Sequence, residues 1–103
     1  MPDLSPSEFV ARQGDGAPVL DVRTPDEFAR GHLAGATLAD LSDLGFLDRV
    51  RSLGLPAEAP VYVYCHSGAR SEQATEVLRR LGHQGAVNAG GLVALVQAGA
   101  ALA

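Results

Sequence analysis

The sequence predicts an α/β fold in which a mostly parallel sheet is covered by helices on both faces. Short apolar runs alternate with segments whose apolar residues recur at helical spacing, and this alternation is typical of βα units. The clearest run, Pro60–Tyr64, is β-branched and aromatic, and a helical pattern follows it from Arg70 to Leu81. With 103 residues, 47% of them hydrophobic, the chain is long enough for one modest core, so residues 1–103 are expected to form one domain.

Two capping boxes mark the helices of the amino-terminal part. Ser5 and Thr24 each stand one residue before a proline and three residues before a glutamate. In this arrangement the side chains satisfy the free N–H groups at the start of a helix. The boxes therefore predict one helix over Pro6–Arg12 and a second, shorter helix from Pro25 to Arg30, which ends at Gly31.

The elements before residue 60 follow from shorter patterns. Val19–Val22 is a short apolar run between turn signals, which predicts a buried strand, and Ala36–Ala39 predicts another strand. Ser42–Ser52 predicts a helix that turns its apolar side chains toward the core. Those side chains are Leu44, Leu47, Val50 and Leu53.

The carboxyl-terminal part completes the alternation. Gly82 is expected to end the helix that begins at Arg70, and Gly85–Asn88 and Leu92–Gln97 predict a last strand and a last helix. In open sheets of this kind, ligands bind beyond the carboxyl ends of the strands. Cys65 lies at one such end and Asp21–Arg23 lies at another, so both are candidates for a site.

Composition excludes several classes of function. The net charge is −4, and the eight basic residues are scattered arginines, so no nucleic-acid surface is expected. A single cysteine allows no internal disulfide, and the histidines share no metal-ligand spacing with it, so no metal site is expected. The first residues have no signal-peptide pattern, and the apolar tail 90–103 is shorter than the roughly 20 residues of a membrane span. A cytoplasmic domain without membrane contact is therefore expected.

The lone cysteine lies in a loop with the features of an anion site. Gly68 permits positive φ between the strand and the next helix, so that successive N–H groups can converge on a negative charge. These donors, together with Arg70, would lower the pKa of the Cys65 thiol. A lone cysteine is more often a small buried hydrophobe, but its position at a strand end before this loop favours a nucleophile. His66 is expected to point toward solvent and to modulate the access of substrate.

Four segments in sequence order resemble the motifs of a single-domain rhodanese-like protein, and the resemblance extends over almost the whole chain. They are Leu20–Phe28, Gly31–Ala36, Tyr64–Ser71 and Gly90–Gly91. The resemblance implies a three-layer α/β/α fold around a five-stranded, mostly parallel sheet. It also implies thiosulfate:cyanide sulfurtransferase activity in which Cys65 cycles through a persulfide, without a metal or another cofactor.

The same resemblance implies roles for the residues around Cys65. A small anionic donor such as thiosulfate would supply the sulfur, and cyanide, a thiol or an acceptor protein would take it. The anion-binding loop would be formed by His66, Ser67, Gly68, Ala69, Arg70 and Ser71. Asp21, Arg23 and Glu27 would support the base of the loop, with Arg23 and Glu27 as a pair. Many relatives have a tryptophan where this chain has Leu95, which predicts a change in the packing of the last helix.

Two other functions are compatible with the sequence. A sulfur-carrier or regulatory docking module would need the same loop but would have little turnover of its own. Cysteine phosphatases and the arsenate reductases that resemble them share the fold, but they have five residues between the cysteine and the arginine. Only four separate Cys65 from Arg70, and this smaller loop suits one sulfur atom better than a phosphate.

Overall fold

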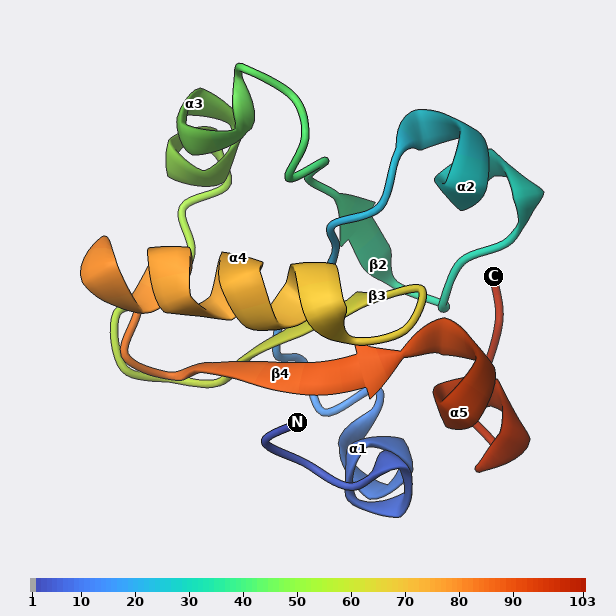
Figure 1. The fold of residues 1–103 in the computed structure, drawn as a ribbon. Helices are drawn as coiled ribbons and strands as arrows, with labels where there is room; N and C mark the ends of the chain where they lie inside the picture. Colours follow the sequence, from blue (N-terminus) through green and yellow to red (C-terminus); the bar gives the residue numbers. More distant parts are fainter. Residues whose placement is uncertain (1) are drawn as a thin grey trace.

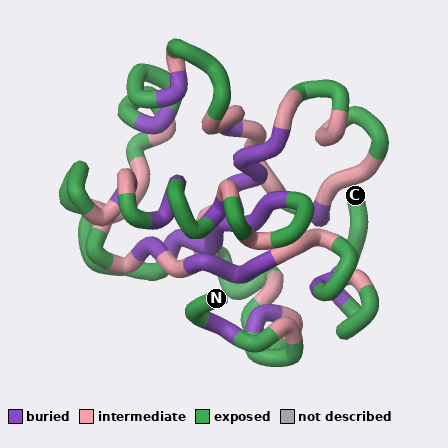
Figure 2. Tube along the Cα trace, viewed as in Figure 1, coloured by how far each residue is buried: buried purple, intermediate pink, exposed green. Residues whose placement is uncertain are grey.

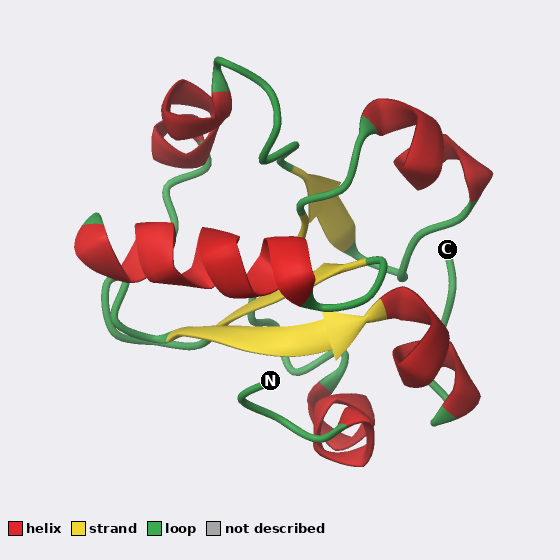
Figure 3. Cartoon of the chain, in the orientation of Figure 1, coloured by secondary structure: helices red, strands yellow, loops and turns green. Residues whose placement is uncertain are grey.

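The computed structural model describes residues 2–103, and its helices and strands alternate as the sequence predicts (Figure 1; Figure 3 colours the same view by element type). The elements are α1 (Pro6–Arg12), β1 (Val19–Asp21), α2 (Pro25–Arg30), β2 (Ala36–Leu38), α3 (Phe46–Ser52), β3 (Val61–Cys65), α4 (Ala69–Arg80), β4 (Ala86–Gly91) and α5 (Leu92–Gln97). Within residues 2–103, no helix has the length and apolar character needed to cross a membrane.

The strands form one parallel sheet in the order β2-β1-β3-β4. Alternation along β3 divides its side chains between two faces, because successive residues of a strand point to opposite sides. Val61, Val63 and Cys65 join the core under α3 and α4, whereas Tyr62 and Tyr64 join the core under α1 and α5. The predicted three-layer α/β fold is confirmed, and the buried positions run along the strands between the helical layers (Figure 2).

The expectation of five strands is wrong, because the described residues form a sheet of four. Residues 2–4 lie beside β4 but do not pair with it as a strand. The Asp3 N–H donates to the carbonyl of Asn88 at 2.8 Å, but the Asn88 N–H donates back to the Asp3 side chain, also at 2.8 Å. A side-chain carboxylate thus replaces the backbone carbonyl that a ladder would need, and Pro2 has no N–H to continue it.

The helix predicted over residues 42–52 begins only at Phe46. Asp40 holds the preceding residues in a turn, since its side chain accepts from the Ser42 N–H and its carbonyl accepts from the Asp43 N–H. Leu44 is fully exposed and Leu47 is 42% exposed, so the prediction that these two face the core is wrong. Among the described residues of α3, the buried ones are Phe46 and Val50, so the periodic pattern was read one position out of phase at its start.

A β-bulge in β4 shapes the end of the sheet next to the cysteine. Val63 is opposite Asn88, but the next residue, Tyr64, is opposite Gly90, so Ala89 is the extra residue. Gly90 has a φ of 98°, which a residue with a side chain would rarely adopt. The bulge places Asn88 and the two following glycines beside the loop that carries Cys65.

Candidate functional site

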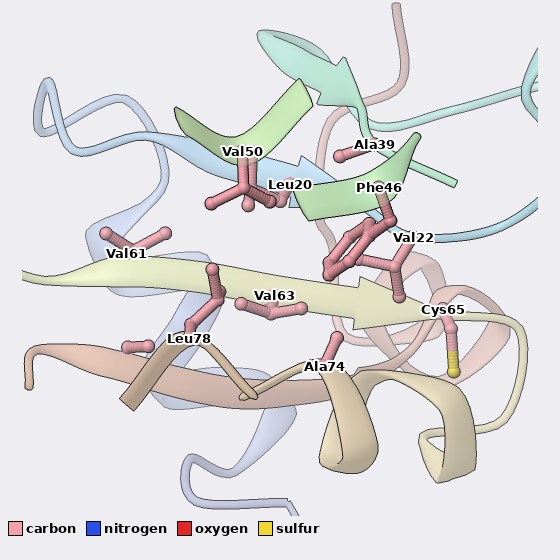
Figure 4. Packing of buried hydrophobic residues seen from close by; sticks show 11 residues of the cluster. Leu20, Val22, Ala39, Phe46, Val50, Val61, Val63, Cys65, Ala74 and Leu78 are labelled. Carbon is pink, nitrogen blue, oxygen red and sulfur yellow. The ribbon is translucent and has the colours of Figure 1, made fainter. Parts of the chain in front are cut away.

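Cys65 is the last residue of β3, and its side chain lies at the start of α4, at the carboxyl edge of the sheet (Figure 4). The loop from His66 to Gly68 turns the chain into α4 within three residues. Gly68 makes that turn with a φ of 100° and stands at the N-cap of the helix. Cys65 is fully buried, so the loop closes around its sulfur.

The sulfur of Cys65 receives hydrogen bonds from the loop and from the first turn of α4. The Gly68 N–H donates to Sγ at 3.0 Å, and the hydroxyl of Ser71 lies 3.4 Å from it. Burial alone would raise the pKa of the Cys65 thiol, but the Ser71 hydroxyl and the N–H groups of Ser71, Gly68 and Ser67 outweigh it. The net result is a pKa below the ordinary value of a cysteine, so the loop stabilises a thiolate.

Arg70 forms an ion pair with Glu27 on α2. Its two terminal nitrogens donate to the two carboxylate oxygens at 2.7 and 2.9 Å, which is a bidentate pair. Arg70 holds the pKa of Glu27 at about 2, assisted by hydrogen bonds from Thr24. In this arrangement Arg70 fastens the loop to α2.

Arg23 and Glu27 do not pair with each other, so that expectation is wrong. Instead, the Arg23 guanidinium folds back onto Asp21, with its closest contact at 2.7 Å from Oδ2. The same nitrogen also donates to the carbonyl of Gly31 at 2.6 Å. Tyr64 donates its hydroxyl proton to Asp21 at 2.6 Å, so a buried network ties β1, β3 and the loop after α2 together below the site.

Asn88, which the sequence analysis did not select, completes the floor of the site. Its side-chain oxygen accepts from the Ser71 hydroxyl at 2.7 Å and from the Gly90 N–H at 2.9 Å. Its amide nitrogen donates to the carbonyl of Gly68 at 3.3 Å. The signal in the sequence is a single amide side chain within an otherwise apolar predicted strand. Such a side chain is expected to be buried and to require hydrogen-bond partners, and Asn88 is indeed buried.

The paired glycines of β4 allow the loop to lie directly on the strand. A Cβ atom at Gly91 would be 2.5 Å from the carbonyl oxygen of His66 and 2.9 Å from the Cα of Ser67. A Cβ at Gly68 would meet the backbone of Gly90 at 3.5 Å. The glycine pair Gly90–Gly91, the last of the four motifs in the sequence, thus lies where two backbones approach each other closely.

An apolar cavity of about 520 Å³ opens next to the loop, between α2 and α5. Leu92, Val93 and Val96 from α5 line one side, and His66 borders it. His66 is exposed, in the position that the sequence analysis gave it. Leu95 points the other way and is fully buried in the core under α1 and α5, so the last helix packs without a tryptophan.

The predicted site residues thus divide into two groups. Cys65, Ser67, Gly68 and Ser71 lie around the sulfur, and Ala69 begins the helix that holds Ser71. The other predicted residues form two ion pairs: Arg70 with Glu27, which ties the start of α4 to α2, and Arg23 with Asp21, which is buried next to Tyr64. Chemically, the arrangement offers one thiol with a lowered pKa, a cluster of N–H and O–H donors directed at its sulfur, and an apolar surface nearby.

Known proteins of similar sequence and structure were found for this chain. Residues 5–98 match the family model described as Rhodanese-like domain. The chain is 36% identical over 75 residues to the thiosulfate sulfurtransferase GlpE of Pseudomonas entomophila; the match covers 73% of this chain and 65% of GlpE, just under two thirds of its length. It is 27% identical over 90 residues to the putative sulfur carrier protein YrkF of Bacillus subtilis, covering 85% of this chain and 46% of YrkF. The human single-domain sulfurtransferase TSTD1 has a similar structure, with a TM-score of 0.78, 27% identity and coverage of 94% and 96%.

Proposed function

The chain belongs to the rhodanese-like domain family, and from that membership and the site we propose that it is a sulfurtransferase that carries sulfane sulfur on Cys65. The observation that supports this most directly is the sulfur of the one cysteine, buried beneath the N–H of Gly68 and the hydroxyl of Ser71. Donors aimed at a sulfur atom favour its charged form, which is the nucleophile.

In the first half-reaction, the Cys65 thiolate attacks the outer sulfur of thiosulfate. A bond forms between Sγ and that sulfur, the S–S bond of thiosulfate breaks, and its electron pair leaves with sulfite. The charge then resides on the outer sulfur of the persulfide, where the loop N–H groups and the positive end of α4 stabilise it. Because Cys65 is fully buried, the loop must open by a local motion before the donor reaches Sγ.

In the second half-reaction, an acceptor removes the outer sulfur and regenerates the thiolate. Cyanide would leave as thiocyanate, and a thiol would leave as a persulfide. The apolar cavity between α2 and α5 borders the loop through His66, and we propose that the organic part of a thiol acceptor occupies it. Of the charged residues that line it, Arg23 and Glu27 are paired with Asp21 and Arg70, and Arg30 adds a guanidinium, so the cavity offers an apolar surface from α5 with one cation beside it.

The proposal is tested by the mass of the protein. Incubation with thiosulfate should add one sulfur atom, and cyanide should remove it. Cys65→Ser should add none, because a hydroxyl does not form a persulfide under these conditions. The rate of the first step should already be high at pH values below the ordinary thiol pKa, since the loop lowers the pKa of Cys65. A protein that never gains sulfur from thiosulfate would contradict the proposal.

A sulfur-carrier function is the second candidate, and the similarity to YrkF favours it. A carrier would gain the same single sulfur but would pass it on only to a partner. Steady-state turnover with thiosulfate and several small acceptors separates the two functions, because a carrier stops after one sulfur. Release of phosphate from an aryl phosphate would instead favour the phosphatase alternative, for which the loop between Cys65 and Arg70 is one residue short.

A further inference from the structure

The hydroxyl of Ser71 has more acceptors around it than protons to donate. It lies 2.7 Å from Asn88 Oδ1, 3.0 Å from the carbonyl oxygen of Gly68 and 3.4 Å from Cys65 Sγ. A hydroxyl has one proton, so only one of these acceptors can hold it in a strong hydrogen bond at a time. The shortest contact is the one to Asn88.

The orientation of the Asn88 amide is fixed by its other partners. The atom that faces Ser71 also faces the Gly90 N–H at 2.9 Å, and of the two terminal atoms of an amide side chain only the oxygen accepts a hydrogen bond. The amide nitrogen faces the carbonyl of Gly68 at 3.3 Å. Asn88 therefore presents an acceptor to Ser71. The Ser71 hydroxyl can donate its proton either to Asn88 or to the sulfur, but not to both at once.

We propose that Asn88 is a positioning residue that competes with the Cys65 sulfur for the proton of Ser71. With a neutral thiol, the hydroxyl donates to Asn88. With a thiolate, the charged sulfur is the stronger acceptor, and the hydroxyl turns toward it. No proton is transferred; a rotation of one O–H bond follows the charge on the sulfur.

Under the proposed sulfur transfer, on which this step rests, the competition would act twice in each cycle. In the persulfide the charge lies on the outer sulfur, and Sγ becomes a weakly accepting neutral atom. The hydroxyl would then return to Asn88, and it would turn back when the acceptor leaves a thiolate. Because the hydroxyl must give up Asn88 to reach the thiolate, Asn88 offsets part of the stabilisation by Ser71 and keeps both the thiol pKa and the nucleophilicity of the thiolate higher.

The charged groups around the thiol do not provide an alternative source of this control. From β1 comes Asp21, which is paired with Arg23, and from α2 comes Glu27, which is paired with Arg70 of α4. His66 in the loop is exposed. Removing Asn88 leaves both ion pairs in place, so its effect on the thiol should pass through Ser71.

The experiment is a double-mutant cycle on the pKa of Cys65, measured from thiolate absorbance and from the pH dependence of alkylation by iodoacetamide. Ser71→Ala should raise the pKa, because a donor to the thiolate is lost. Asn88→Ala should lower it by about half a unit to one unit, because the nearest competing acceptor of the Ser71 hydroxyl is lost and only the backbone carbonyls still compete with the sulfur. In the Ser71→Ala background, Asn88→Ala should leave the pKa unchanged. An equal shift in both backgrounds, or no shift in either, would overturn the proposal.

A second measurement requires no change at Asn88 and decides the question if Asn88→Ala does not fold. The side-chain carbonyl carbon of Asn88 should change its NMR chemical shift as Cys65 titrates, because its hydrogen bond from Ser71 is lost when the thiolate forms. In Ser71→Ala this titration should disappear. A titration that persists there would contradict the proposal. Neither measurement uses a sulfur donor, so its outcome is independent of whether thiosulfate is the substrate.

Discussion

Gly91→Ala should damage the site through one steric contact. The φ of Gly91 is −103°, which alanine adopts without strain, so the added methyl acts only through its collision with the loop. Its Cβ would be 2.5 Å from the His66 carbonyl oxygen, whereas ordinary contact begins at 3.4 Å. The loop must therefore retreat by about 0.9 Å, the difference between those two distances. A displacement of this size costs on the order of 100-fold in rate when it moves reacting groups.

Gly85→Ala is the matched control for this variant. A methyl there collides with the backbone carbonyls of Glu58 and Ala59, but Gly85 precedes β4 and lies about 20 Å from Gly91 along the strand. Both variants should lose about 1–3 kcal/mol in the free energy of unfolding, the usual cost of overpacking. The rate of persulfide formation per folded molecule should fall only in Gly91→Ala.

The assay combines a denaturant melt with intact-mass measurement of sulfur uptake from thiosulfate at several times. The melt gives the folded fraction, and the mass gives the rate. If Gly91→Ala forms persulfide as fast as Gly85→Ala, then the approach of β4 to the loop does not set the position of Cys65, and the reasoning fails.

Three further variants test other contacts. Tyr64→Phe leaves the Leu33 N–H without a partner and removes one hydrogen bond from Asp21 Oδ2, which keeps Arg23, so it should cost about 1–3 kcal/mol of stability in a urea melt. The Glu27 carboxyl has its pKa lowered to about 2 from 4.5, so its ion pair should stabilise the fold above about pH 4.5 and lose its effect as the pH falls toward 2. Comparing wild type with Glu27→Gln across that range should show about 1 kcal/mol that vanishes in acid, whereas a constant difference would argue against it. Val93→Asp should slow transfer to an apolar thiol roughly fivefold and leave transfer to cyanide unchanged, if the cavity holds the acceptor.

Local signals in the sequence predicted α1, α2, α4 and α5 well, whereas α3 begins four residues later than expected. Both capping boxes form as expected, because Ser5 and Thr24 bond to groups only three residues away. The glycine stop and the apolar spacing of α4 are also local, and its bounds differ from the prediction by one residue at each end. The fold class follows from these elements because strands alternating with helices have few ways to bury their apolar faces.

Partners far apart in the sequence were harder to predict. The sequence offers Arg23 as a nearby partner for Glu27. In the folded chain Glu27 binds Arg70 instead, which is 43 positions away. Arg23 is instead held by Asp21, whose position next to Tyr64 depends on the pairing of β1 with β3. Asn88 was missed for the same reason, since only the bulge in β4 brings it to Ser71.

The carboxylate of Asp3 also limits the association of the sheet edge with strands of other chains. β4 is at one edge of the sheet, and an open edge offers a row of N–H and C=O groups on which a foreign strand can add. Asp3 occupies that edge with a charged side chain, which holds the Asn88 N–H and is itself held by Arg79 at 3.0 Å. An incoming strand would have to displace this ion pair, so the short segment before α1 protects this edge of the sheet from aggregation.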